Sequence, residues 1–394
     1  MKKVLFLTPS LGTGGMERML VLYANLLAEN GYDVTVLNFT HDDESMRAAF
    51  DPRVHYRNQF MPTPNLWNAS RADIFHGNFR LLPWNLWTRL HSPRYLHKKY
   101  VTDRYDVEIA FFRGASVKIV SGYPKEDALN TVHLAWVHND FRLADGYRDS
   151  FGSIAAAKKA YAAMDHVVCV SRRAMESFRA VIGETNNCAV QYNLLPVRSI
   201  REKAAEPPAV RVPKASFHIA LAARLADRAK GQSRLIRIVK RLHDEGEDVS
   251  LALIGGGPDE AMLRELIETL NAGAYIAMPG MQSNPYPFVR EADLVVCASH
   301  YEGFPLTLAE ALIIGTPVLS TDCTGPTEVL SDGRYGRIVP DDDEALYQGV
   351  RAFLKDPSLK ETYRAAGEER AEELDLRHGM EQIERFLTKA KERA

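Results

Sequence analysis

The chain of 394 residues is longer than one ordinary domain, and its 46% apolar and 25% charged residues are typical of a globular protein. A formal net charge of −2 argues against general nucleic-acid binding. The four cysteines show no CxxC spacing, which argues against a zinc or disulfide framework and fits a reduced, cytoplasmic setting. No apolar run approaches the roughly 18 residues of a transmembrane helix. Any membrane contact is therefore expected to be peripheral.

The first part of the chain predicts a parallel sheet. Residues 4–7 read as a short buried strand, and residues 9–15 as a turn. A helix is expected over 16–30, with Gly31 suited to its C-terminal cap, and a second strand over 34–37. This is a βαβ unit. Further strands are expected at 107–112, 131–137 and 167–170.

A second α/β series begins after residues 197–213, which are rich in proline, alanine and charge and read as a linker. Strands are expected at 217–223, 249–254, 275–278, 294–298 and 317–320, with helices between them. The tail from about residue 357 is polar and helical, without new strands. The predicted fold class is α/β, with two Rossmann-like, doubly wound domains.

The most informative segment is Ser-His-Tyr-Glu-Gly-Phe-Pro-Leu-Thr-Leu-Ala-Glu-Ala, residues 299–311. It follows the buried strand expected at 294–298. Gly303 and Pro305 break the chain into a turn, and residues 306–314 have helical spacing. Free N–H groups and the positive end of the helix dipole meet there, which suits a phosphate. Glu302 and Glu310 lie eight residues apart, so both carboxylates can face one ligand from different depths.

Together with Gly-Thr-Pro-Val at 315–318, this segment resembles the glutamate–seven–glutamate motif of family-4 retaining glycosyltransferases. The alternative is a structural αβ corner with two solvated glutamates. The resemblance implies the GT-B fold, in which two Rossmann-like domains face a cleft. On that basis we expect an acceptor domain at 1–196, a linker at 197–213, a nucleotide-sugar domain at 214–370 and a helix at 371–394 that crosses back to the first domain.

Cations follow the strand expected at 217–223. Arg224 offers a planar fork for phosphate oxygens, and Lys230 offers a point charge. The resemblance implies that both clamp the donor diphosphate, although Ala223 stands where the family has glycine. Two surface cations near a loop are the alternative.

The resemblance also implies the rest of the donor site. Gly255 would let backbone approach the ligand, although a plain tight turn is equally compatible. Met281 and Gln282 would contact the base, and Glu310 would accept both ribose hydroxyls. Glu302 and Gly303 would meet the transferred sugar, and backbone N–H groups of Phe304, Leu306 and Thr307 would meet the sugar or the phosphates.

In the first domain, residues 12–17 resemble a dinucleotide fingerprint but have Glu17 where its last glycine belongs. This disfavours a dehydrogenase. The resemblance implies that Gly14 and Gly15 meet the donor diphosphate and the acceptor, and a glycine turn before a helix is the alternative. His138 stands where the family has a histidine beside the sugar, although a lone histidine is usually structural. Ser171 matches a recurring serine but could simply cap a helix.

Residues 61–102 combine aromatic and basic side chains. They hold three of the four tryptophans and six basic residues against one acid, Asp73. Such a mixture suits an anionic membrane surface or a lipid-linked phosphate acceptor. Core packing of the tryptophans, with solvated charges, is the alternative. The residues assigned to acceptor or membrane contact are Trp67, Trp84, Trp87, Arg89 and Arg94.

We therefore expect a retaining glycosyltransferase that moves a hexose or N-acetylhexosamine from a nucleotide diphosphate sugar, with UDP favoured by the resemblance, to a glycan or lipid-linked acceptor in polysaccharide or lipopolysaccharide assembly. The catalytic residues implied are His138, Arg224, Lys230 and Glu302. No cofactor and no metal are expected. A GT-B nucleotide-sugar epimerase and a non-catalytic glycosyltransferase-like subunit are the alternatives. The setting is cytoplasmic, with a peripheral position on the inner face of the membrane left open.

Overall fold

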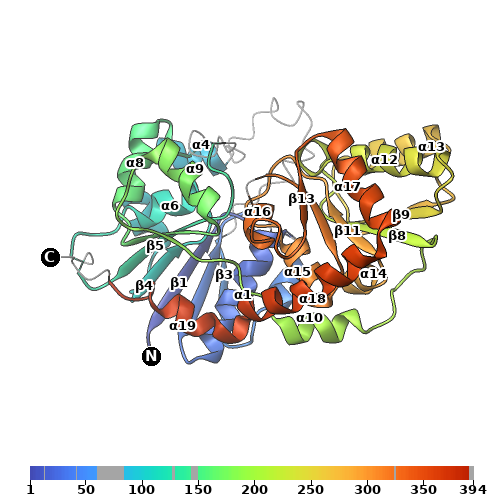
Figure 1. Cartoon of the computed structure of the whole chain (residues 1–394). Helices are drawn as coiled ribbons and strands as arrows, with labels where there is room; N and C mark the ends of the chain where they lie inside the picture. Colours follow the sequence, from blue (N-terminus) through green and yellow to red (C-terminus); the bar gives the residue numbers. More distant parts are fainter. Residues whose placement is uncertain are drawn as a thin grey trace. The chain divides into compact units, whose positions relative to one another are not determined.

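The computed structural model describes residues 1–12, 14–40, 42–59, 84–126, 129–142, 150–323 and 325–389. The chain divides into two compact units (Figure 1). The first unit comprises Met1–Tyr192 together with His378–Ala394, and the second comprises Asn193–Arg377. No helix within the described ranges is long and apolar enough to cross a membrane.

The described residues of the first unit form a parallel sheet in the order β3-β2-β1-β4-β5-β6-β7. Val4 of β1 pairs with Val34 of β2 on one side and with Val107 of β4 on the other. The strands are β1 (Lys3–Thr8), β2 (Asp33–Asn38), β3 (His55–Asn58), β4 (Val107–Ala110), β5 (Val132–Val137), β6 (His166–Cys169) and β7 (Cys188–Val190).

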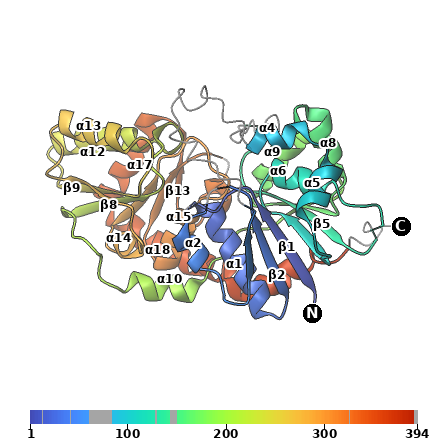
Figure 2. The same ribbon diagram turned by 180° about the vertical axis from the view of Figure 1, so that it is seen from behind.

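Helices cover both faces of this sheet (Figure 2). The helix α1 packs with α19 on one face, whereas α6, α8 and α9 pack side by side on the other. The helices are α1 (Gly15–Glu29), α2 (Glu44–Ala48), α4 (Trp84–Leu90), α5 (Pro93–Tyr100), α6 (Ala115–Val120), α8 (Ile154–Ala162), α9 (Arg172–Ile182) and α19 (Gly379–Glu384). Gly31 has φ +83° and follows the end of α1, as expected of a glycine at a helix C-terminus.

The core of the first unit is aromatic. The Tyr23 ring stacks on Trp136 with ring centroids 5.1 Å apart, and Phe111 lies 5.3 Å from the same tryptophan. These rings come from α1, β5 and the end of β4, so their packing joins a covering helix to the middle of the sheet.

The second unit also has a parallel sheet, in the order β10-β9-β8-β11-β12-β13. Its strands are β8 (Phe217–Ala222), β9 (Val249–Ile254), β10 (Ile276–Gly280), β11 (Leu294–Cys297), β12 (Val318–Thr321) and β13 (Arg337–Val339). The inner strands are buried and mostly apolar, as expected where helices cover both faces of a sheet; their buried polar residues are His218, Ser250, Ser320 and Thr321.

The helices α12, α13 and α17 lie on one face of this sheet, and α10, α14, α15 and α18 lie on the other (Figures 1 and 2). The helices are α10 (Val197–Ala204), α11 (Asp227–Lys230), α12 (Gln232–Asp244), α13 (Glu260–Thr269), α14 (Tyr286–Arg290), α15 (Leu306–Ile314), α16 (Pro326–Val329), α17 (Asp343–Lys355) and α18 (Pro357–Glu373), and a short 3₁₀ helix covers Leu376–His378.

The strands expected from the apolar runs are present within one or two residues. Three further strands, β3, β7 and β13, were not anticipated. Each lies at the edge of its sheet, where fewer side chains are buried and the apolar pattern is correspondingly weak.

The expected linker at 197–213 is wrong over its first half. Residues Val197–Ala204 form helix α10, which packs on α14 and α15 of the second unit. Its buried side chains are Val197, Ile200 and Ala204, one face of a short helix. The proline- and charge-rich composition obscured this face.

Candidate active site

The strand order of the second sheet reverses between β8 and β11, because β8 pairs with β9 on one side and with β11 on the other. In open α/β sheets, ligands bind at the carboxyl ends of strands at such a switch point. Two loops start there, residues 223–231 after β8 and residues 298–305 after β11. They carry Arg224 and Lys230, and Glu302 and Gly303, respectively.

The structure brings Lys230 and Glu302 into direct contact. The Lys230 ammonium group donates to Oε1 of Glu302, and the Ser299 hydroxyl donates to the same oxygen at 3.1 Å. The two side chains are only 23% and 15% exposed. Burial acts to lower the pKa of Lys230, but the Glu302 carboxylate outweighs it and the net shift is upward. Lys230 is therefore a fixed positive charge beside a carboxylate.

The backbone also joins these two loops. The His300 N–H donates to the Ala229 carbonyl at 3.0 Å. Gly231 has φ +63°, and a Cβ atom there would lie 2.3 Å from the Ala298 carbonyl oxygen. Only glycine fits both this conformation and this approach. Lys230 and Glu302 therefore meet because the main chains beside them are in contact.

The N-terminus of α15 adds a second source of positive potential. Pro305 precedes the helix and offers no side-chain cap, and the N–H groups of Leu306 and Thr307 lie in the first turn, where an α-helix has no acceptor for them. A Cβ atom on Gly325 would lie 2.7 Å from the carbonyl of Gly303, so the loop after β12 packs against the turn before the helix. This end of α15 suits an anion.

Glu310 lies one turn inside α15 and is 3% exposed. The Tyr286 hydroxyl of α14 donates to its Oε1 at 3.0 Å. This buried hydrogen bond orients the carboxylate. Tyr286 was not anticipated, because a hydroxyl 24 residues earlier in the chain carries no local signal. The contact of Glu310 with ribose remains a prediction.

The loops after β8, β9 and β10 adjoin one another. The Leu225 N–H donates to the Gly256 carbonyl at 3.0 Å, and a Cβ on Gly255 would lie 2.0 Å from the Ala223 carbonyl oxygen. Met281, which is 61% exposed, has its terminal methyl group 3.6 Å from where a Cβ on Gly256 would stand.

The remaining donor-site residues of this edge are Arg224 and Gln282. Arg224 is exposed, and the Gln282 amide donates to the Pro279 carbonyl at 2.8 Å within its own turn. Phosphate contact by the first and base contact by the second remain predictions.

In the first unit, His138 follows β5, and one nitrogen of its ring is hydrogen-bonded to the main chain. Its Nε2 lies 2.9 Å from the carbonyl oxygen of Phe111, so this nitrogen carries the proton and donates it. Its Nδ1 is then an acceptor, buried without a hydrogen-bond partner among the described residues. Burial lowers the pKa of His138 to about 3. At neutral pH the ring is uncharged and acts as a hydrogen-bond acceptor.

Gly14 and Gly15 lie where the turn after β1 enters α1, and both are exposed. A Cβ on Gly14 would lie 2.4 Å from a Glu17 carboxylate oxygen, so Glu17 folds back over the turn. Ser171 is the N-cap of α9 and accepts from the Ala174 N–H at 3.0 Å, which confirms the capping alternative. His138, Gly14 and Ser171 belong to the first unit, and the Lys230–Glu302 pair belongs to the second.

Part of the aromatic and basic segment is described. Trp67 and the side chain of Trp84 lie outside the described residues. The Trp87 indole donates to the Tyr100 hydroxyl at 3.1 Å and lies under the Lys99 ammonium group, 4.6 Å from the ring centre. Trp87 therefore packs within its own unit, whereas Arg89 and Arg94 are exposed.

Comparisons with known proteins agree with this geometry. Residues 13–196 match the family Glycosyltransferase Family 4, and residues 203–370 match the family Glycosyl transferases group 1. An uncharacterised glycosyltransferase of Methanocaldococcus jannaschii is 29% identical over 285 residues, 63% of this chain and 69% of that protein.

A second relative is the N-acetylgalactosamine-N,N'-diacetylbacillosaminyl-diphospho-undecaprenol 4-alpha-N-acetylgalactosaminyltransferase of Campylobacter jejuni. It is 31% identical over 190 residues, 48% of this chain and half of that protein. Among solved structures, HepE of Anabaena, in complex with UDP and glucose, superposes with a TM-score of 0.71 over 98% of this chain and 99% of that one, at 18% identity. This last likeness concerns the fold alone.

Two parallel-sheet, Rossmann-like units with this structural neighbour have the GT-B fold, and the family matches identify a transferase enzyme. The two family matches together span nearly the whole chain. The chain belongs to the family-4 glycosyltransferases.

The low pKa of His138 predicts a pH-dependent stability of the first unit. Between pH 6.5 and 3 the unfolded chain binds a proton that the folded chain does not, so stability falls as the pH is lowered. The wild-type protein should lose up to about 1.4 kcal/mol per pH unit more than His138→Gln between pH 6 and 4. Urea unfolding followed by tryptophan fluorescence measures this, since all four tryptophans belong to the first unit. Parallel pH dependences of the two proteins would contradict the assignment.

Proposed function

We propose that this protein is a retaining glycosyltransferase that moves a hexose or N-acetylhexosamine from UDP to a glycan or lipid-linked acceptor in cell-surface polysaccharide or lipopolysaccharide assembly. The observation that carries the proposal is the contact between Lys230 and Glu302, made by the two loops that leave the switch point of the second sheet.

The reaction needs positive charge where the nucleotide diphosphate departs. Cleavage of the bond to the sugar leaves negative charge on the β-phosphate. Lys230, Arg224 and the N-terminus of α15 supply positive potential along one sheet edge, and Lys230 is already held there by Glu302. Groups fixed before the reaction need not reorganise during it, and they stabilise charge more effectively than water does.

Glu302 serves a different purpose in this proposal. An oxocarbenium-like centre develops on the sugar, and in retaining hydrolases a carboxylate attacks it. The Glu302 carboxylate instead accepts from both Lys230 and Ser299 at the same oxygen. These donors lower its nucleophilicity and fix its direction, so we assign it to binding sugar hydroxyls. The acceptor then attacks on the face that the diphosphate leaves, and the leaving phosphate takes the acceptor's proton.

We also assign His138, in the first unit, to sugar binding. Because its Nε2–H is committed to Phe111, its Nδ1 can only accept, and a sugar hydroxyl is a suitable donor. A neutral ring also adds no positive charge beside a cationic transition state.

Names of similar proteins support the donor and acceptor classes. HepE binds UDP and glucose, and the Campylobacter relative is named for an undecaprenol diphosphate-linked acceptor. The choice of UDP as the nucleotide, the identity of the sugar and the absence of a metal requirement belong to the proposal.

A thermal-shift experiment tests the donor site. UDP, GDP and ADP and their common sugar conjugates are added to the full chain, with and without EDTA. We expect UDP to raise the Tm by several degrees, since about 100 Kd of ligand adds about 2.7 kcal/mol. EDTA should leave that shift unchanged. A Tm shift with GDP alone would show that the donor nucleotide is GDP and not UDP. No shift with any nucleotide would reject the donor site and favour a non-catalytic subunit.

Substitution of Glu302 separates chemistry from binding. Glu302→Ala should lower sugar transfer by at least about 100-fold, because the sugar loses its positioning carboxylate, while UDP still raises the Tm. The exposed carboxylate of Glu268 on α13 provides a matched control, and Glu268→Ala should retain full activity. Retained turnover by Glu302→Ala would overturn the assignment. Conversion of the donor without any acceptor would instead indicate an epimerase.

Peripheral membrane contact by α4 and α5 is the second part of the proposal. Leu90 and Tyr95 are 66% and 46% exposed, and Arg89, Arg94 and Lys98 are exposed beside them. The Lys118 ammonium group donates to the carbonyl oxygens of Thr88 and Arg89, which anchors α4 to the unit, while Leu86, Arg89 and Leu90 of this helix are exposed. Apolar and basic side chains on one surface suit an anionic bilayer.

Vesicle co-sedimentation tests this contact. The protein should sediment at low salt with phosphatidylcholine vesicles that contain about one third phosphatidylglycerol, but not with phosphatidylcholine alone. Arg89→Glu/Arg94→Glu should abolish sedimentation, and Arg211→Glu/Arg351→Glu, an equal charge change at exposed positions of the second unit, should not. Absence of sedimentation by the wild-type protein would exclude this contact.

A further inference from the structure

A third loop of the second unit reaches the loops that hold Lys230 and Glu302. It comprises residues 340–342, between β13 and α17, at the same carboxyl edge of the sheet, and leads directly to Asp343, the first residue of α17. This third loop is connected to the loop after β11 by Arg234 of α12, whose side chain is only 6% exposed. A buried guanidinium group must be fully paired, so its partners show what it holds in place.

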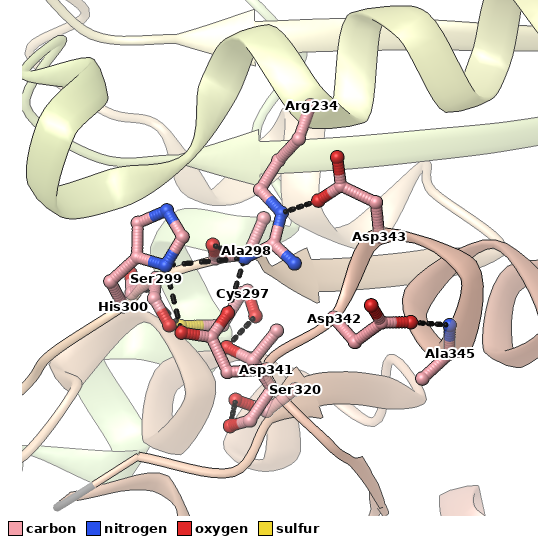
Figure 3. Close-up of polar contacts among 11 residues, drawn as sticks. Arg234, Cys297, Ala298, Ser299, His300, Ser320, Asp341, Asp342, Asp343 and Ala345 are labelled. Atoms are coloured by element: carbon pink, nitrogen blue, oxygen red, sulfur yellow. Dashed lines mark hydrogen bonds and ion pairs between the residues drawn. The ribbon is translucent and has the colours of Figure 1, made fainter.

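Arg234 gathers groups from two loops (Figure 3). Its guanidinium donates to Oδ1 of Asp341, to Oδ1 of Asp343 at 2.7 Å and to the Ala298 carbonyl at 3.4 Å. Ala298 is the residue after β11, against which Gly231 is packed. The buried arginine therefore binds the start of the loop that carries Glu302.

Asp341 connects the same loop a second time. Its Oδ2 lies 2.8 Å from Nδ1 of His300, which donates to it, while Oδ1 accepts from Arg234 (Figure 3). Burial acts to raise the pKa of Asp341, but the hydrogen bonds from Arg234 and His300 outweigh it and lower it. The carboxylate is ionised and bridges two donors, one on α12 and one on the loop after β11.

His300 connects this hydrogen-bond network to both loops, the one that carries Lys230 and the one that carries Glu302. Its backbone N–H is bonded to the Ala229 carbonyl, and Ala229 immediately precedes Lys230. His300 itself is two residues before Glu302. We propose that Asp341 and His300 are positioning residues, which hold Lys230 and Glu302 in the arrangement that glycosyl transfer requires. This inference rests on the catalytic roles given to that pair under the proposed function.

A comparison of the expected effects on folding free energy and on reaction rate favours a positioning role over a merely structural one. The side chains of His300 and Asp341 are 44% and 30% exposed. A partly exposed pair of this kind contributes about 1 kcal/mol or less to folding. A shift of about 1 Å in a catalytic group, by contrast, can lower a rate by about 100-fold. Loss of the pair should therefore affect turnover more than stability.

The first experiment compares Asp341→Asn with Asp343→Asn in the full chain. Both changes remove one carboxylate from Arg234, but only Asp341 also contacts His300, and Asp343 is 73% exposed. UDP release is measured with whichever of UDP-glucose, UDP-galactose, UDP-N-acetylglucosamine and UDP-N-acetylgalactosamine the wild-type protein turns over. We expect Asp341→Asn to lower kcat about 10- to 100-fold with KM changed less than about 3-fold, and Asp343→Asn to stay within about 2-fold.

A conservative rescue distinguishes the hydrogen bond from bulk packing. His300→Asn keeps an N–H donor near the position of Nδ1, whereas His300→Ala does not. The asparagine variant should recover kcat to within about 5-fold of wild type, and the alanine variant should match Asp341→Asn. Equal kcat values for the two His300 variants, or an unchanged kcat for Asp341→Asn, would overturn the inference.

Hydrogen exchange supplies a readout that does not depend on turnover. In the absence of substrate, Asp341→Asn should accelerate amide exchange in peptides covering 226–231 and 298–305, and Asp343→Asn should not. Unchanged exchange in both peptides overturns the positioning role. If the wild-type protein turns over none of the four UDP-sugars, the proposed function fails for those donors, and hydrogen exchange alone decides whether the network holds the two loops.

Discussion

The pairing of Lys230 with Glu302 is the interaction on which the arrangement of the loops at the carboxyl edge of the second sheet depends. A lysine and a carboxylate that are mostly withdrawn from water are costly to keep apart, because each would be left as an unbalanced buried charge. They can meet only because the sheet reverses its strand order between β8 and β11, which places the two loops next to each other. The switch point therefore decides where the charge pair forms.

Backbone contacts between the two loops hold Lys230 and Glu302 in position. Gly231 allows the loop after β8 to touch the Ala298 carbonyl, and the bond from His300 to Ala229 closes the contact on the other side of Lys230. Arg234 and Asp341 add an anchor from outside the two loops, so three segments distant in sequence are held at one edge of the sheet.

The two units contribute different chemistry. The second unit presents fixed positive charge, while the first presents a neutral histidine whose protonation is suppressed by burial. The difference is physically reasonable. Under the proposed function, a departing diphosphate requires positive charge beside it, whereas a sugar that develops positive charge is better met by an uncharged hydrogen-bond acceptor. Both sets of residues follow parallel strands, so the same topological rule positions each of them in its own unit.

Much of this protein could be predicted from its sequence because the signals are local. Inner strands are mostly apolar, the segment from Glu302 to Glu310 has a specific spacing, and the resemblance it carries named the family. The edge strands β3, β7 and β13 and helix α10 were missed, since a strand or helix that buries few side chains leaves little periodic pattern. The sequence by itself determined most of the elements, the family and the residue types predicted for the donor site. Only the tertiary structure decided which distant partners those residues have, including Lys230 on Glu302, Tyr286 on Glu310 and Asp341 on His300. These pairings join segments through the sheet topology, and contact across a fold has no local signature in the chain.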